Sequence, residues 1–273
     1  NGNIKYYDNE TDNYKQDNYQ LHFIHSFSNK LNVNVTGHYT KGKGYYEQYK
    51  QGEALSAYNM PDVVVDSNTT ISSTDLIRRR WLDNDFTGVI ANINYKPSTL
   101  LNFVLGGGYN TYFGKHFGEV IWAQYSNPND FKPVYYNNQA NKSDANVYLK
   151  TTIRPTDKLT AFVDLQYRNV NYNFLGFDTS LIEKKQVYTS FGFFNPKVGI
   201  NYLVTKNTNV YASYGIANKE PNRDDFINSS KKSRPKHEQL NDLEIGATHR
   251  FKNISIGLNF YDMQYKNQLV LNG

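Results

Sequence analysis

The sequence predicts an all-β protein, an antiparallel transmembrane β-barrel segment of about ten strands. Three observations lead to this prediction: apolar and polar residues alternate, the alternation stays in register across short polar turns, and long polar loops separate the hairpins. The mean hydropathy is −0.71, yet 24 Tyr and 16 Phe supply strand-forming aromatic residues. No apolar run approaches the roughly 18 residues that a membrane helix needs. A barrel strand, in contrast, needs only about ten alternating residues.

Five hairpins are expected around short turns. These turns are residues 28–30, 96–98, 154–158, 205–207 and 252–253. Counting outward from the first turn places Phe27 opposite Leu31 and Tyr19 opposite Tyr39. The positions between these apolar residues are mostly polar, as in strands that have two different surroundings.

The same counting gives a register for the other four hairpins. Ile93 is expected opposite Leu101, and Leu149 opposite Val163. The last two hairpins place three pairs each on the apolar face: Val198, Ile200 and Tyr202 with Tyr214, Ala212 and Val210, and Ile245, Ala247 and His249 with Phe260, Leu258 and Ile256. Nearly every pair is apolar, so one face of the whole sheet is predicted to be apolar.

Connections of two lengths favour a membrane barrel over a soluble sandwich. Short turns alternate with long loops, which are expected at residues 42–80 and 218–239. Short turns at one end and long loops at the other are typical of outer-membrane barrels. Five tyrosines near the long-loop ends fall on the apolar face, where an interfacial aromatic belt belongs: Tyr19, Tyr39, Tyr109, Tyr167 and Tyr214.

Several segments resemble one family in the family's own order. They are GHYTKGKGYYEQYK (37–50), RRRWLDNDFTG (78–88), FNPKVGINY (194–202), VYASYGIANKEPNRDDF (210–226) and YDMQYKNQLVLNG (261–273). They are similar to the barrel of TonB-dependent outer-membrane receptors, and most similar to the Bacteroidetes-type iron and siderophore receptors.

This resemblance implies a barrel of about 22 strands with an amino-terminal plug. Residues 1–273 would be a partial barrel domain, the middle of a receptor whose plug, TonB box and remaining strands are absent from this sequence. The implied function is uptake of a scarce nutrient, a ferric siderophore or similar iron complex, without enzymatic activity. The implied partners are the bacterial outer membrane with its lipopolysaccharide, the small ligand, and the TonB complex acting through the plug.

Candidate ligand-binding residues lie at the strand tops. Tyr45, Tyr46 and Tyr49 follow Gly42 and Gly44, where the glycines would let the backbone bend. Tyrosine rings facing a vestibule would contact a siderophore, and rings packed between loops would only stabilise them.

A second group is basic. Arg78, Arg79, Arg80 and Trp81 would attract an anionic ferric chelate, contact lipopolysaccharide phosphates, or pair with the nearby Asp83 and Asp85. Arg223 is the ligand-binding candidate within the charged segment 220–225, for which loop architecture is the simpler interpretation.

Other kinds of site are not indicated. The chain has no Cys, and its six His do not follow a metal-ligand spacing, so no metal site and no cofactor are expected. The net charge is +5, but the basic residues do not form one stripe, so no nucleic-acid partner is expected.

Two other functions remain open at this stage. A closed ten-stranded outer-membrane protease would use acidic residues and a histidine to activate water, and Asp224, Asp225 and His237 could serve. A soluble β-rich glycan-binding protein would use exposed tyrosines.

Overall fold

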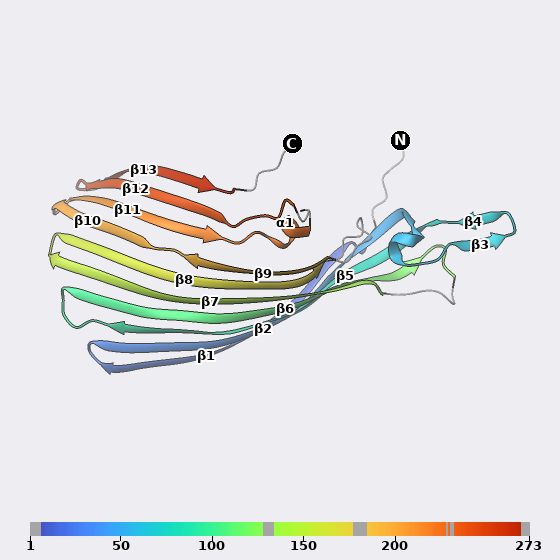
Figure 1. The fold of residues 1–273 in the computed structure, drawn as a ribbon, viewed down its shortest axis with the longest axis horizontal. Helices are drawn as coiled ribbons and strands as arrows, with labels where there is room; N and C mark the ends of the chain where they lie inside the picture. The colour runs from blue at the N-terminus through green and yellow to red at the C-terminus, as the bar shows by residue number, and fades with distance from the viewer. Residues whose placement is uncertain (1–6, 128–133, 177–184, 228, 230–231, 269–273) are drawn as a thin grey trace.

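A single antiparallel sheet makes up most of the molecule (Figure 1). The computed structural model describes residues 7–127, 134–176, 185–227, 229 and 232–268. The strands of the main sheet are β1 (Thr11–Ser28), β2 (Leu31–Ala54), β5 (Ser73–Tyr95), β6 (Leu101–Ala123), β7 (Val134–Thr156), β8 (Leu159–Gly176), β9 (Lys185–Phe194), β10 (Lys197–Thr205), β11 (Thr208–Lys219), β12 (Glu238–Arg250) and β13 (Ser255–Lys266). Smaller elements are the 3-10 helix η1 (Leu55–Tyr58), the hairpin β3 (Val63–Asp66) and β4 (Thr69–Ile71), and the helix α1 (Arg223–Ile227).

The main sheet has eleven strands in the order β1-β2-β5-β6-β7-β8-β10-β11-β12-β13, with β9 paired to β8. β10 pairs with residues 159–164 of β8, and β9 pairs with residues 167–176 of the same strand. The eleven strands therefore occupy ten positions in the sheet. Asn195 and Pro196 separate β9 from β10, because a proline has no N–H to donate to a ladder. The antiparallel barrel segment predicted from the sequence is confirmed.

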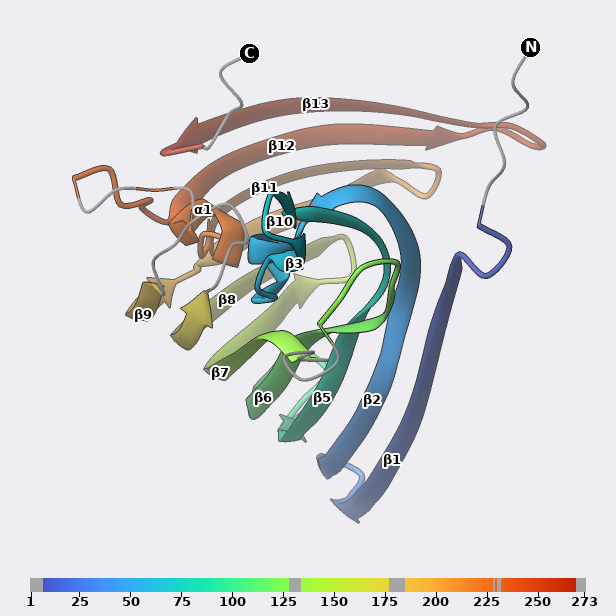
Figure 2. The ribbon, with the colours of Figure 1, turned by 90° about the vertical axis from the view of Figure 1, so that its right-hand side faces the viewer.

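The sheet curves into an open trough (Figure 2). The five short turns lie at one end, whereas the β3–β4 hairpin and the far ends of the long strands lie at the other (Figure 1). α1 lies on the concave side of the trough (Figure 2). Among the described residues, no helix has the length and apolar character required to cross a membrane.

The expected register is confirmed in part. Tyr19 lies opposite Tyr39, and the last two hairpins pair as predicted throughout. Phe27 does not lie opposite Leu31, because a shift between residues 26 and 28 places Ser28 there.

The registers of the second and third hairpins were predicted wrongly. Ile93 lies opposite Leu105, four residues further along than expected, and Leu149 lies opposite Leu165, two residues further along. In the second hairpin the connection comprises residues 96–100, longer than the predicted turn at 96–98, and Leu100 O accepts a hydrogen bond from Arg154 N–H of β7. Both shifts are even, so every side chain keeps its predicted face.

The predicted loop at residues 42–80 is largely strand. β2 continues to Ala54, and β5 begins at Ser73, with η1, β3 and β4 between them. Both strands therefore extend far beyond Tyr39, where water on both faces permits the charged alternation seen from Lys41 onward. The loop at 218–239 is confirmed, because β11 ends at Lys219 and β12 begins at Glu238.

The two faces of the wall differ in chemistry. Apolar residues such as Leu105 (47% exposed) and Val147 (52%) project outward, as lipid contact requires. The inner face carries polar pairs, including Asn34 Nδ2 donating to Asn92 Oδ1 at 2.9 Å. We define the membrane-spanning segments as those between the short turns and the tyrosine row formed by Tyr19, Tyr39, Tyr109, Tyr167 and Tyr214. All five of these tyrosines are exposed.

Candidate functional site

The strand alternation divides the predicted site residues between two faces. Tyr45 lies opposite Trp81, and Tyr46 lies opposite Arg80. Because neighbouring residues on a strand point to opposite faces, the predicted residues do not form one cluster. Tyr45, Tyr49, Arg79 and Trp81 share the outer face, while Tyr46, Arg78 and Arg80 share the inner face.

The outer residues are held by local partners. Arg79 Nε lies 2.7 Å from Glu47 Oε2, and its guanidinium lies 4.4 Å from the centre of the Tyr45 ring. Trp81 Nε1 donates to Glu119 Oε2 at 2.8 Å and its ring stacks on Phe117. These contacts support the packing interpretation for the outer group.

Of the alternatives left open for the arginines, pairing with Asp83 and Asp85 is not found in the structure. Both carboxylates lie on the outer face, where Lys41 Nζ approaches them at 2.6 and 2.8 Å. Gly42 was also misinterpreted as a bend. It lies in the regular ladder opposite Gln16, and a Cβ there would collide with the Tyr14 ring, so the glycine provides space.

Arg78 and Arg80 form the centre of the inner group. Arg80 Nε donates to Tyr136 Oη at 3.2 Å, and its guanidinium lies 5.7 Å from the centres of both the Tyr46 and Tyr136 rings. Arg78 donates to Tyr58 Oη at 2.9 Å and to Gln48 Oε1 at 3.0 Å. Within the described ranges, neither guanidinium forms an ion pair with a carboxylate.

Two buried polar atoms of this group have no hydrogen-bond partner. They are Arg78 Nε and Tyr135 Oη. An unsatisfied buried donor costs free energy, so such atoms call for an explanation. The inner cluster thus combines two uncompensated positive charges with unused hydrogen-bonding capacity.

A small apolar core positions these side chains. Leu55 and Tyr58 of η1 pack on the inner face against Leu76, Val120 and Tyr135, and all five are buried. This packing places the Tyr58 hydroxyl beside Arg78.

Close approach of the neighbouring rings depends on Gly118. A Cβ at that position would lie 2.3 to 2.4 Å from ring atoms of Tyr135 and Tyr136. The glycine therefore allows both tyrosines to lie against β6 and allows Tyr136 to reach Arg80.

Arg223, at the start of α1, adds a third positive charge near this region. Its guanidinium lies 5.8 Å from the Phe174 ring centre, and its link to Asp224, which is largely exposed, is 3.6 Å long. His116 of β6 lies between the two regions: burial lowers the pKa of its imidazole, and the positive charges of Arg223 and Arg80 lower it further. β5, β6 and α1 thus bring their cations into one electrostatic neighbourhood.

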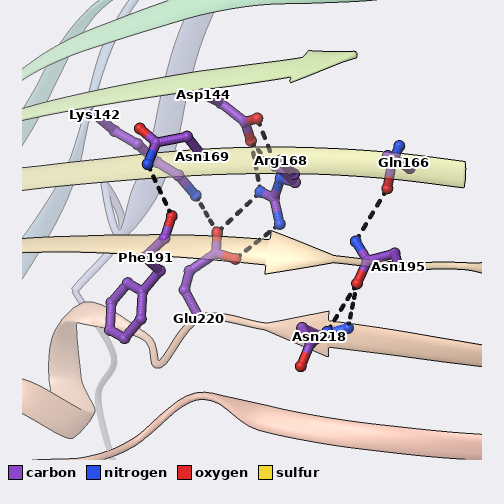
Figure 3. A network of polar contacts seen from close by, with 9 residues as sticks. All are labelled: Lys142, Asp144, Gln166, Arg168, Asn169, Phe191, Asn195, Asn218 and Glu220. Atoms are coloured by element: carbon purple, nitrogen blue, oxygen red, sulfur yellow. Dashed lines mark hydrogen bonds and ion pairs between the residues drawn. The ribbon is translucent and has the colours of Figure 1, made fainter. Parts of the chain in front are cut away.

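A charge-balanced network holds the start of the loop that carries Arg223 (Figure 3). Glu220 Oε1 accepts from Lys142 Nζ at 2.7 Å, and Glu220 Oε2 accepts from Arg168 Nη1 at 2.9 Å. Arg168 also pairs with Asp144. Burial alone would raise the pKa of Glu220, but the bonds from Lys142, its own backbone N–H and Arg168 lower it to about 2.

Apolar packing fixes the rest of this loop. Phe226 of α1 is buried against Phe174 and Val187. Asn195, beside the network, donates to Gln166 Oε1 and accepts from Asn218 (Figure 3). Arg223 is thus held by elements that are themselves anchored to the wall.

A comparison with protein families matches the whole chain. The family described as "TonB dependent receptor-like, beta-barrel" covers residues 1–273. The chain belongs to this family. The resemblance predicted from the sequence motifs is confirmed, and no curated protein matches the chain.

Solved receptor barrels have the same fold. The ferric-catecholate import receptor Fiu from E. coli K12 in its closed form has a TM-score of 0.62 at 16% identity, with 96% of this chain and 42% of that chain covered. The ferric citrate transporter FecA has a TM-score of 0.69 at 12% identity, covering 93% and 35%. The siderophore receptor PiuA from Acinetobacter baumannii has a TM-score of 0.60 at 14% identity, covering 92% and 40%. The chain therefore spans about two fifths of the length of these receptors.

In the receptor barrel, the residues considered for a protease have other contacts. Asp225 Oδ2 accepts from the Asn222 N–H at 2.6 Å. His237 packs edge-on against Phe191 and Phe193. Within the described residues, no three His, Cys, Asp or Glu side chains are grouped so that they could hold a metal ion.

Sequence reasoning missed half of the inner cluster. Tyr58, Tyr135, Tyr136 and His116 were not singled out, since three of them lie outside the predicted strands and His116 belongs to no motif. Continuing the period-two pattern of β5 would have placed Arg78 and Arg80 on one face and separated them from Arg79.

Proposed function

We propose that this chain forms the wall and outer loops of a TonB-dependent outer-membrane receptor that imports an anionic ferric siderophore or a similar iron complex. It acts as a transport protein and not as an enzyme. The observation that carries the proposal is the pair Arg78 and Arg80 on the inner face, without a carboxylate partner in the described part of the chain. The membership in a receptor family and the fold shared with ferric siderophore receptors support it.

The chemistry of the cluster suits such a ligand. Ferric complexes of catecholates and carboxylates carry negative charge, which guanidinium groups attract through charge-assisted hydrogen bonds. Tyr46 and Tyr136 flank Arg80 and offer flat surfaces to aromatic or planar chelating groups.

In this proposal, the complete receptor also contains a plug domain and further barrel strands. A plug domain and further strands would close the barrel, because open sheet edges cannot remain in lipid with unpaired backbone groups. The plug would contact the TonB complex, which supplies energy. The barrel would lie in the bacterial outer membrane, surrounded by lipopolysaccharide, with the tyrosine row at the membrane boundary.

The test is ligand binding by the complete receptor. Ferric catecholate, ferric citrate, haem, cobalamin and a neutral oligosaccharide are titrated against the wild type and two variants. Arg80→Gln removes an inner charge, and Arg79→Gln removes an outer charge one residue away. Loss of one charge-assisted hydrogen bond predicts about tenfold weaker binding of the anionic chelate to the Arg80→Gln variant.

Three results would oppose the proposal. Equal weakening by both variants would show that the effect is not specific to the inner face. If Arg80→Gln binds the anionic chelate as tightly as the wild type, the inner cluster is not part of the ligand-binding site. Selective binding of cobalamin or the neutral oligosaccharide would replace the iron complex as the transported ligand.

A further inference from the structure

The end of the trough that carries the five short turns is strongly basic (Figure 1). The segments that form this end are residues 29–30, 96–100, 154–158, 206–207 and 250–254. We call their cationic side chains the turn rim, which consists of Lys30, Lys96, Arg154, Lys158, Lys206, Arg250 and Lys252. All of these cations are exposed, and Asp157 is the one carboxylate in these segments, every residue of which the structure describes.

Hydrogen bonds between neighbouring turns make the turn rim continuous. The bonds run from Lys96 N–H to Lys30 O, from Arg154 N–H to Leu100 O and from Leu203 N–H to Lys158 O at 2.8 Å each, and from Arg250 N–H to Asn207 O at 2.9 Å. They link all five turns side by side. Cations that lie tens of residues apart in the sequence are therefore held in one row by the fold, although the sequence contains no basic stripe.

The charges of the turn rim are not neutralised by the described part of the chain. None of its cations forms an ion pair there. Lys30 and Lys96 are direct neighbours through their backbone bond, and like charges in such positions are unfavourable. An anionic partner would offset this repulsion.

The cations turn toward the concave side of the trough and not toward lipid. Lys96 follows Tyr95, and Arg154 follows Ile153, both of which are residues of the outer face. Successive residues of an extended chain point to opposite faces, and the proline after each of these two cations keeps the cation extended. Tyr95 is therefore left at the lipid boundary, while the cations border the aqueous opening of the trough.

The turn rim is as wide as the sheet. Its turns serve ten strand positions, and neighbouring strands lie about 4.8 Å apart, so the row extends over about 45 Å. A small anion would contact only adjacent turns, whereas the face of a folded protein extends over such a distance. The size of the row therefore favours a macromolecular partner.

We propose that the turn rim is a docking edge for a soluble protein with an acidic face. This inference rests on the proposed placement of the barrel in the outer membrane, since short turns of such barrels lie on the periplasmic side. Carboxylates on the partner would pair with the cations, speed association and fix the orientation of the complex. The docking edge lies at the opposite end of the strands from the cluster around Arg80.

The experiment measures binding of a fluorescent poly-L-glutamate peptide to the complete receptor in phosphatidylcholine nanodiscs, at an ionic strength of about 0.05 M to limit screening. The rim variant combines Lys96→Gln, Arg154→Gln and Lys158→Gln. The matched control combines Lys232→Gln, Arg234→Gln and Lys236→Gln, three exposed cations between α1 and β12 at the other end of the strands.

Loss of three exposed ion pairs predicts about tenfold weaker peptide binding for the rim variant, and little change for the control. Equal binding by the two variants would overturn the proposal. Displacement of the peptide by ferric citrate at the same concentration of carboxylate would replace the protein by a small anion. Loss of peptide binding when phosphatidylglycerol is added to the nanodiscs would assign the turn rim to lipid instead.

The side of the membrane is tested with Lys206→Cys, since the chain has no other cysteine. A membrane-impermeant maleimide should label this cysteine only after the outer membrane of the cells is opened. Labelling in intact cells would overturn the periplasmic partner.

Folding and the proposed function are checked separately. Heat-modifiable migration shows whether each variant is folded, and the rim variant should bind ferric chelate like the wild type. A receptor that binds chelate but shows no difference between the rim variant and the control contradicts only the docking edge. A receptor that shows this difference but binds no chelate contradicts only the proposed ligand.

Discussion

Glu220, the first residue after β11, is tied to Arg168 of β8, with Oε2 2.9 Å from Nη1. The Glu220 side chain is 9% exposed, and Lys142 approaches its other oxygen. This contact joins the loop after β11 to β8, two positions away in the sheet. Together with the packing of Phe226, it attaches the Arg223 loop to the wall.

Glu220→Gln is expected to loosen this loop. The variant keeps the size of the side chain but loses the charge, and a hydrogen bond to a charged group contributes about 1.5–3 kcal/mol. The rate of proteolytic cleavage between residues 220 and 237 should therefore increase. Asp224→Asn is the matched control, because the Asp224 side chain is 80% exposed. Equal cleavage of the two variants would show that Glu220 does not anchor the loop.

The attachment should also depend on pH at the acid end. The pKa of Glu220 is lowered from its ordinary value of 4.5 to about 2 by Lys142, its own backbone N–H and Arg168, against the opposing effect of burial. Because the pKa is lower in the folded loop, the ionised Glu220 stabilises the folded loop, and this stabilisation is complete above about pH 4.5. That stabilisation is lost as the pH falls through about 2. Pepsin cleavage of the wild-type loop should rise across this window. In Glu220→Gln it should already be high and should not show this rise; a parallel rise would assign the effect to another group.

Arg79 is predicted to support structure and not ligand binding. Its partner Glu47 is almost fully buried, and burial would raise the pKa of that carboxyl, but hydrogen bonds from Tyr7 and Arg79 lower it overall. Arg79→Gln removes the charged partner and should reduce the free energy of unfolding by about 2 kcal/mol. Replacing Glu47 by Gln as well should recover part of that loss, since no buried charge then remains. Urea unfolding in detergent measures the free energy of unfolding of the single and double variants. Strictly additive effects of the two substitutions would contradict an interaction between Arg79 and Glu47.

Gly118 and Gly37 provide a contrast between two strand glycines. A Cβ at Gly118 would collide with the rings of Tyr135 and Tyr136, whereas a Cβ at Gly37 would meet no atom within 4 Å. Gly118→Ala should cost about 1–3 kcal/mol through overpacking and should weaken chelate binding, because Tyr136 positions Arg80. Gly37→Ala should be neutral or slightly stabilising. The unfolding temperatures of the two variants test this contrast. Equal unfolding temperatures would mean that the Tyr135 and Tyr136 rings move aside without cost.

The fold could largely be predicted because period-two alternation survives local error. The alternation pattern assigned Leu149 and Ile93 to the correct face even though their predicted partners were wrong. The predicted registers differ from the observed ones by even numbers of residues, which leaves each side chain on the same face. The extension of β2 to Ala54 could not be predicted, because beyond Tyr39 water contacts both faces and the apolar signal ends.

The candidate site was predictable only at the level of residue type. Arg78, Arg79 and Arg80 were found as a group, but their roles depend on partners brought from β2, η1 and β7. Tyr58 and Tyr136 reach the arginines across 20 and 56 residues of sequence. No local pattern contains such contacts, which arise from the packing of η1 against the inner face.

The corrected register of the second hairpin can be tested directly with cysteine pairs. The chain has no cysteine, so a disulfide can form only between introduced residues. Asn94 lies opposite Val104 on the inner face, whereas the register expected from the sequence places Asn94 opposite Leu100. The two alternatives differ by about 13 Å along the strand, and a disulfide needs Cα atoms within about 7 Å. Asn94→Cys with Val104→Cys should therefore cross-link on oxidation in the folded receptor, seen as altered migration reversed by reductant. Asn94→Cys with Leu100→Cys should remain reduced, and efficient cross-linking of that pair would restore the shorter turn.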